Sequence, residues 1–177
     1  MPLILLMISA ERLQMVELVN YRFDHRDSLV KLLNNPNVEK WLLSVPSPYT
    51  YKDADYFIAN SIFDINIPDV RRFAIETGGI HIGGIGLRIK QNYYAEVGYW
   101  IGEEYWNCGY GSEALKQIME IAFEDLSLVR LSAIVFEGNY ASEKILLKCG
   151  FEYEGTMEKG RVKNGVPVDC KVYAKVI

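Results

Sequence analysis

The chain has 177 residues, 50% of them apolar, and a formal net charge of -4. This length and composition predict one globular domain with a sizeable core, and the acidic balance argues against binding to a nucleic-acid backbone. A mildly acidic surface suits a cationic or amine-bearing partner, although solubility alone would also explain it.

The first eight residues are apolar but too few to cross a bilayer, so we expect no membrane attachment. No basic region precedes them, and Glu11 and Arg12 follow closely, so the pattern does not indicate a signal peptide. We interpret this segment as an edge strand, a docked arm or a partner surface. The third interpretation leaves a homodimer open.

Hydrophobic periodicity and turn residues predict the remaining elements. In chain order these are a strand over 13–21, helices over 24–34, 38–43 and 52–64, strands over 72–77, 81–89 and 94–101, a helix over 109–124, a strand over 129–136, a helix over 139–148, and strands over 151–162 and 167–176. Pro36 ends the first helix, Thr50 caps the third, and Gly150 caps the last. The pair Asn164 and Gly165 predicts a hairpin turn.

This order of elements predicts the fold class. Successive strands form antiparallel meanders, whereas the strand, helix and strand over 94–136 form a central parallel, right-handed unit. We therefore expect a mixed α/β fold of the α+β type, with a mostly antiparallel, twisted sheet, in a single domain over 1–177.

The cysteines and histidines exclude some kinds of site. Cys108, Cys149 and Cys170 are odd in number and form no C-x-x-C pair, which favours reduced thiols in the cytoplasm over disulfides or zinc. His25 and His81 are far apart in the sequence, so we expect no metal site.

The segment Trp106–Leu115 is the most informative motif. Gly109 and Gly111 carry no Cβ atoms, and the helix that follows directs its free N–H groups back at the loop. This layout is typical of a phosphate or pyrophosphate site, although a plain turn or helix start has the same pattern. Two nucleotide motifs are excluded, because the glycines at 83–86 lie inside a strand and no P-loop is present.

Two further positions carry polar groups that need a reason. Asn139 and Ser142 begin the last helix, where an N-cap pair is one explanation and a bond to a peptide-like ligand arm is another. Glu96 lies in a strand that is otherwise apolar. A carboxylate there is either functional, or a rim residue or salt-bridge partner.

Together the segments Ala95–Ile101, Tyr105–Leu115 and Asn139–Phe151 resemble the GNAT superfamily of acetyl-CoA-dependent N-acetyltransferases. The branch that they resemble comprises the ribosomal-protein N-terminal (RimJ/RimL-like) acetyltransferases. The resemblance implies a twisted sheet of about seven strands, flanked by helices and splayed at a central strand pair.

The resemblance also implies site residues, with acetyl-CoA as cosubstrate and no metal. Glu96 would be the general base, and Ser142 would serve the leaving sulfur, because Leu146 occupies the position where many relatives carry a tyrosine. Cys108 departs from the basic or amide side chain usual in relatives. The implied cofactor-binding residues are Tyr99, Trp100, Ile101, Cys108, Gly109, Tyr110, Gly111, Ser112 and Asn139.

The acceptor is implied less closely. The branch favours a protein N-terminal amine, as on a ribosomal protein, without direct binding to nucleic acid. Two alternatives stay open: an acetyltransferase for a polyamine, an amino acid or an antibiotic amine, and a non-catalytic CoA-binding sensor. We expect the acceptor wall at Trp41, the loop 46–51, Tyr93 and the final hairpin.

Overall fold

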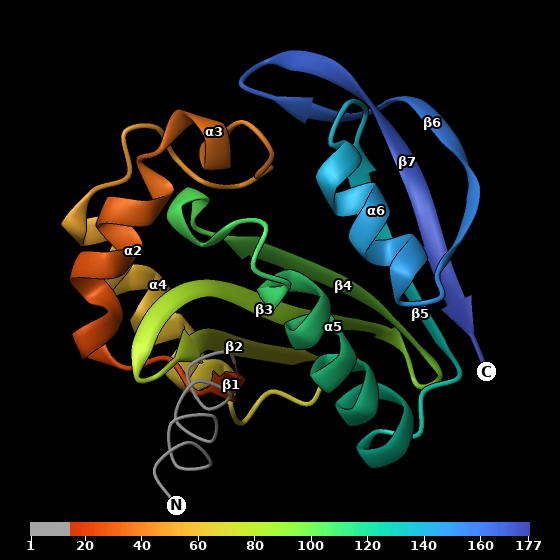
Figure 1. Cartoon of the computed structure of the whole chain (residues 1–177), viewed down its shortest axis with the longest axis horizontal. Coiled ribbons are helices and arrows are strands. Elements are labelled where there is room, and N and C mark those ends of the chain that lie inside the picture. The colour runs from red at the N-terminus through yellow and green to blue at the C-terminus, as the bar shows by residue number, and fades with distance from the viewer. Residues whose placement is uncertain (1–14) are drawn as a thin grey trace, which may run out of the picture.

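The computed structural model describes residues 15–177. Its strands form one sheet in the order β1-β2-β3-β4-β5-β7-β6 (Figure 1). The strands are β1 (Val16–Val19), β2 (Val70–Thr77), β3 (Ile80–Gln91), β4 (Tyr94–Ile101), β5 (Arg130–Phe136), β6 (Glu152–Lys163) and β7 (Val166–Val176). The helices are α2 (Arg26–Leu33), α3 (Pro36–Glu39), α4 (Tyr51–Asp64), α5 (Tyr110–Glu120) and α6 (Tyr140–Lys148). Among the described helices, none is long and apolar enough to span a membrane.

The predicted mixed α/β fold is confirmed, and most element boundaries agree within a few residues. The predicted caps and turn form as expected: the Thr50 side chain accepts from the Asp53 N–H, and Gly150 takes a φ of 84° after α6. Asn164 and Gly165 have φ values of 50° and 80°, as a tight hairpin between β6 and β7 requires. The opening segment and the first two residues of the predicted first strand lie outside the described residues.

Three predicted helices were wrong in extent. The helix expected over 38–43 is Pro36–Glu39, because Asn35 caps it and the fixed φ of Pro36 suits a first helical position. The helix expected over 24–34 is divided into a 3₁₀ turn, Phe23–His25, and α2. The helix expected to reach residue 124 ends at Glu120 and continues as a π-helical turn, Ile121–Asp125.

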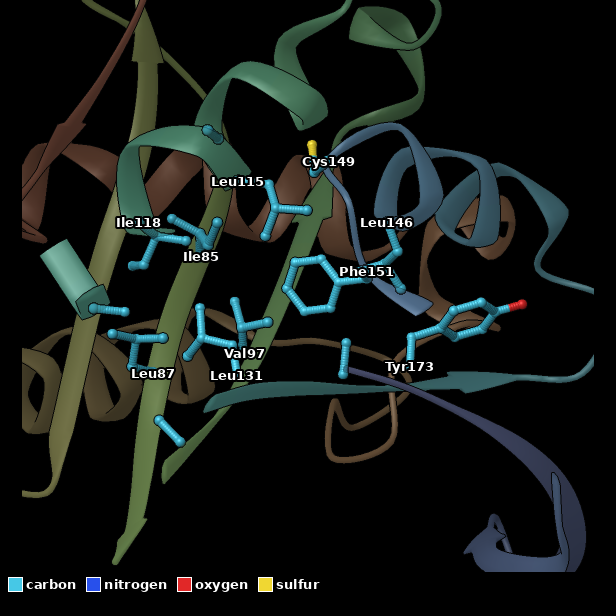
Figure 2. Packing of buried hydrophobic residues seen from close by; sticks show 14 of the residues in the cluster. Ile85, Leu87, Val97, Leu115, Ile118, Leu131, Leu146, Cys149, Phe151 and Tyr173 are labelled. Atoms are coloured by element: carbon cyan, nitrogen blue, oxygen red, sulfur yellow. The ribbon is translucent and has the colours of Figure 1, made fainter. Parts of the chain in front are cut away.

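Each face of the sheet has its own apolar core, and Figure 1 shows α5 in front of the sheet with α4 behind it. On the front, Phe151 is fully buried and lies among side chains of α5 and α6 that include Leu115 and Leu146 (Figure 2). Burying such side chains stabilises the fold by about 1.5–3 kcal/mol each. The rear core packs α2 and α4 against β2, with Leu29 and Ile58 fully buried.

The central pair β4 and β5 is parallel, as predicted, and it separates early. The two strands pair only from Tyr94 opposite Arg130 to Glu96 opposite Ser132. β4 pairs with β3 along its whole length, so its later residues have lost a partner strand only on the β5 side. Their edge groups on that side are available to a ligand that adds itself as a strand.

Alternation along β4 divides its side chains between the two faces of the sheet. Val97 and Tyr99 pack with the front core, whereas Trp100 packs with the rear core. Glu96 and Gly98 share the parity of Trp100 and therefore belong to the rear face. The space between the diverging strands β4 and β5 is therefore lined by different β4 side chains on the front and on the rear of the sheet.

Candidate active site

A cavity of about 890 Å³ occupies the divergence between β4 and β5. Its walls come from β4, β5, the starts of α5 and α6, the segment after α3, and β6. Most of the predicted site residues line it: Glu96, Tyr99, Trp100, Ile101, Gly109, Tyr110, Gly111, Asn139 and Ser142. Cys108 and Ser112 do not; Cys108 is exposed, and Ser112 is buried with its carbonyl oxygen 3.7 Å from the Cys149 thiol. The fold therefore assembles three sequence segments that share no local contact.

The glycine loop presents the uncapped start of α5 to this cavity. Gly109 is the N-cap residue, with a φ of 84°, a conformation that glycine adopts without strain. No side chain among residues 15–177 caps the helix, so its first N–H groups need an outside acceptor. A Cβ atom at Gly111 would lie 3.0 Å from Cδ1 of Ile145, so α5 begins in close contact with α6. An anion is the natural partner of such a terminus.

The backbone of β4 has a distinct direction at each residue. The carbonyl of Trp100 lies against Gly83 on β3, so this group belongs to the sheet. The carbonyl of Ile101 faces away from β3 and accepts a hydrogen bond of 2.7 Å from the indole N–H of Trp106. This bond ties the glycine loop to the end of β4. By alternation, both backbone groups of Tyr99 and the N–H of Ile101 face the divergence.

Ser142 takes part in two different interactions. Its backbone N–H donates to Oδ1 of Asn139 at 3.3 Å, so the predicted N-cap is confirmed. Its hydroxyl lies 2.9 Å from the hydroxyl of Tyr99, which also lies 3.3 Å from the Ser142 carbonyl oxygen. The cap does not use the hydroxyl, so Oγ of Ser142 is available for chemistry.

The sequence indicated Tyr99 only as a cofactor-binding residue. It did not indicate that the Tyr99 hydroxyl would contact Ser142. Burial raises the pKa of the Tyr99 hydroxyl above its ordinary value, so this group stays protonated at neutral pH. Leu146 is fully buried in the front core and is not among the residues that line the cavity. The tyrosine hydroxyl beside Ser142 therefore comes from β4. No local sequence signal joins two residues 43 positions apart.

Glu96 lies at the vertex of the divergence, opposite Ser132 in the last paired register. Its side chain is half-buried and lines the cavity. Among the described residues, none forms an ion pair or a hydrogen bond with this carboxylate, which excludes the salt-bridge explanation within 15–177. A partly buried carboxylate without a partner is suited to receive a proton or a cation.

One lysine holds the wall opposite the glycine loop. The ammonium group of Lys163 on β6 contacts Oε1 of Glu39 at 2.6 Å and donates to the carbonyls of Glu39 at 3.0 Å and Leu42 at 2.7 Å. The hairpin of β6 and β7 consequently arches over α3, as Figure 1 shows. This contact brings Trp41 into the cavity lining as predicted, whereas Tyr93 and the loop 46–51 lie outside that lining.

A buried histidine pair supports Trp100 from behind. The ring of His81 stacks on His25 at 4.8 Å and meets Trp100 edge-on at 5.8 Å. The Ser28 hydroxyl donates to the carbonyl of His25, so Nδ1 of His81 donates to Oγ of Ser28 at 2.7 Å. This leaves Nε2 of His81 as a buried atom without a hydrogen-bond partner among residues 15–177.

Comparison with known proteins agrees with this geometry. Residues 16–152 match the family profile described as the acetyltransferase (GNAT) domain. The chain is 39% identical to the N-acetyltransferase YoaA of Bacillus subtilis (strain 168) over 97 residues, which are 54% of this chain and 55% of YoaA. The match therefore spans about half the length of YoaA. The chain is also 26% identical to the L-amino acid N-acetyltransferase AaaT of Escherichia coli (strain K12) over 168 residues, 92% of this chain and 99% of AaaT.

Solved structures share the fold. The structure of RimL, a ribosomal L7/L12 alpha-N-protein acetyltransferase in complex with coenzyme A, matches with a TM-score of 0.83. The match covers 92% of this chain and 94% of RimL, at 22% sequence identity. At this identity, the likeness shows the fold alone.

Proposed function

The chain belongs to the GNAT family of acetyl-CoA-dependent N-acetyltransferases, and from this premise we propose that it acetylates a protein N-terminal α-amino group of the ribosomal-protein type. The observation that carries this proposal is the cavity between β4 and β5. It joins an uncapped helix start to a carboxylate that has no partner among residues 15–177. An anion-binding terminus and a proton acceptor in one cavity are what acetyl transfer from a phosphorylated carrier to an amine requires.

Acetyl-CoA would be held mainly by backbone groups. The N–H groups at the start of α5 would bind the pyrophosphate, and their reliance on backbone explains how the loop functions with Cys108 in place of a basic residue. The pantetheine arm would add itself to β4 at Tyr99 and Ile101, because the Trp100 carbonyl already faces β3. The amide of Asn139 would approach the same arm from α6.

The chemistry then follows from the two faces of β4. Glu96 would take one proton from the ammonium group, and the freed amine would attack the thioester carbonyl. Backbone N–H groups near Tyr99 would stabilise the tetrahedral oxyanion. As the carbon–sulfur bond breaks, the hydroxyl of Ser142 would give its hydrogen bond or its proton to the departing thiolate. Tyr99 would hold that hydroxyl in place at 2.9 Å.

A small-amine acceptor is the second candidate, and one comparison favours it. AaaT, named as an L-amino acid N-acetyltransferase, aligns over nearly the whole chain. The third hypothesis, a CoA-binding sensor without catalysis, does not explain why Glu96 lacks a partner among residues 15–177. A cytoplasmic location is also part of the proposal, and its support is that Cys108, Cys149 and Cys170 are free thiols.

The proposal is tested by release of the CoA thiol from acetyl-CoA with a panel of amines: peptides with free N-termini, amino acids, polyamines and aminoglycosides. We expect turnover to be highest with a peptide. Replacement of Glu96 by Gln should lower kcat/KM about 10²- to 10⁴-fold, the usual contribution of a general base, while CoA binds with unchanged affinity.

The control is Glu158→Gln, which removes an exposed carboxylate outside the cavity and should keep full turnover. Wild-type turnover in Glu96→Gln across a range of pH would refute the base assignment. If acetyl-CoA binds but the CoA thiol is not released with any amine of the panel, the hypothesis of a non-catalytic CoA-binding sensor replaces that of an enzyme acting on these acceptors.

A further inference from the structure

The charge of the cavity differs in sign from the charge of the protein. Its lining contains three cationic side chains, Lys40, Lys144 and Arg161, against a single carboxylate, Glu96. The whole chain has a net charge of -4. Lys144 lies on α6 beside Ser142, on the half that we assign to acetyl-CoA, and its charge suits the cofactor phosphates. Lys40 and Arg161 line the cavity outside this half, so the cofactor phosphates do not explain their charges.

Among the described residues, Arg161 has no charged partner. Its guanidinium group donates to the carbonyl of Gly160 at 2.9 Å. Within residues 15–177 no carboxylate lies within ion-pair distance of it. Arginine offers five donors in a planar fork, so most of its hydrogen-bonding capacity is unused here. A half-buried guanidinium that faces a cavity in this state is suited to receive an anion.

A register shift in β6 sets the position of Arg161 along the hairpin. The pairing of β6 with β7 shifts between Met157 and Arg161, and Lys159 within the shift has a φ of 50°. The backbone N–H of Lys159 donates to Oδ1 of Asp169 at 2.6 Å, which holds the shifted segment. The shift adds two residues to β6, so Arg161 lies opposite Val168. Irregularities of this kind are common beside functional sites.

Arg161 belongs to the wall opposite the cofactor loop. Lys163, two residues later on the same strand, fastens the hairpin to Glu39 and Leu42. Lys40, between those anchors, lies over the ring of Trp41 at 5.1 Å, and both residues line the cavity. The glycine loop and α6, which we assign to acetyl-CoA, form the other walls. An anion bound at Arg161 would therefore belong to the acceptor.

We propose that Arg161 binds a carboxylate of the acceptor, so that the substrate is an amine that carries a carboxylate close to its amino group. This inference rests on the proposed function and narrows it. Glu96 receives the ammonium end, and the guanidinium fork receives both oxygens of the carboxylate. The positive charge of Lys40 adds to the attraction. Two sources share this chemistry: the α-carboxylate of a free amino acid, and an acidic side chain near a peptide N-terminus.

The test measures binding of acetylated products to the CoA-loaded protein by calorimetry, so it does not depend on turnover. One matched pair is N-acetyl-leucine and N-acetyl-leucinamide. The other is N-acetyl-Ala-Asp-Ala-amide and N-acetyl-Ala-Asn-Ala-amide. We expect the carboxylate member of one pair to bind about 10- to 100-fold more tightly, as hydrogen bonds to charged groups allow. The pair that shows the preference identifies the source of the carboxylate.

Arg161→Gln should abolish this preference, and Arg161→Lys should restore only part of it, because an ammonium group cannot match the fork. Lys90→Gln is the control, since it removes one exposed positive charge from β3, outside the cavity. Unchanged CoA affinity in Arg161→Gln shows that the cavity is intact. The inference is overturned if wild-type protein shows no preference in either pair, including no binding of either member, or if the preference survives in Arg161→Gln. If the wild-type protein prefers the carboxylate member of a pair but acetylates no amine, the proposed function is refuted and the carboxylate site at Arg161 stands.

Discussion

The pH dependence of stability should expose the histidine pair behind Trp100. Burial, followed by the charge of His25, lowers the pKa of His81 from 6.5 to about 4. Burial is the main cause, because it removes the charged form of the ring from water, and the backbone of Gly83 and the carboxylate of Glu76 offset only part of this cost. The charged and polar groups around the pair are Arg22, Glu76 and Ser28.

The sign of the effect follows from the two pKa values. At pH values below 6.5, which is the ordinary pKa of histidine, His81 binds a proton in the unfolded chain but stays neutral in the folded protein until the pH approaches 4. The contribution to stability is therefore fully present above pH 6.5 and is lost as pH falls toward 4. The complete loss is about 3 kcal/mol, because each pKa unit corresponds to about 1.36 kcal/mol. Between about pH 7.5 and about pH 5.5, linkage gives a loss of about 1 kcal/mol.

Urea unfolding at these two pH values measures the loss. This window lies above the range in which carboxylates titrate, so Glu76, whose pKa is lowered by His25 and Arg22 against the opposing effect of burial, stays ionised throughout. The variant His81→Asn keeps a donor for the Ser28 hydroxyl but cannot titrate. It should be less stable at both pH values and should lack the loss of about 1 kcal/mol. An equal pH dependence in the two proteins would refute the reasoning.

Two further predictions concern the catalytic hydroxyls and the glycine loop. Ser142→Ala should lower turnover about 10- to 100-fold with little loss of stability, because the helix cap uses the backbone N–H of Ser142. Tyr99→Phe should lower turnover less. In the double variant it should cause no loss beyond that of Ser142→Ala, because Tyr99 acts through the Ser142 hydroxyl. Kinetics and urea unfolding of the single and double variants check this, and additive losses would separate the two hydroxyls. Gly111→Ala presses on Ile145 and should raise the Kd of CoA about tenfold, whereas Gly98→Ala adds a Cβ atom in open space and should not. Equal calorimetric affinities in the two variants would place the pyrophosphate elsewhere.

Local patterns in the sequence were enough to predict the order of the elements and the loop at Gly109. Periodicity identified β4 with its observed ends, and the cap at Thr50 and the turn at Asn164 depend on residues within a few positions of one another. Such interactions join residues that are close in the sequence, so their pattern is visible without the tertiary structure. The errors arose where a neighbour overrode periodicity, as when the Asn35 cap began a helix two residues earlier than its apolar residues indicated.

The site depended on contacts between distant segments. The pairing of Tyr99 with Ser142 spans 43 positions, and that of Lys163 with Glu39 spans 124. The position of Arg161 opposite Val168 depends on a register shift between two strands. The sequence could indicate Glu96 as a carboxylate in an apolar strand and Ser142 as part of an N-cap pair. Only the divergence of β4 from β5 decided that they share one cavity, because a polar group finds or lacks its partner only when packing has brought distant strands and helices together.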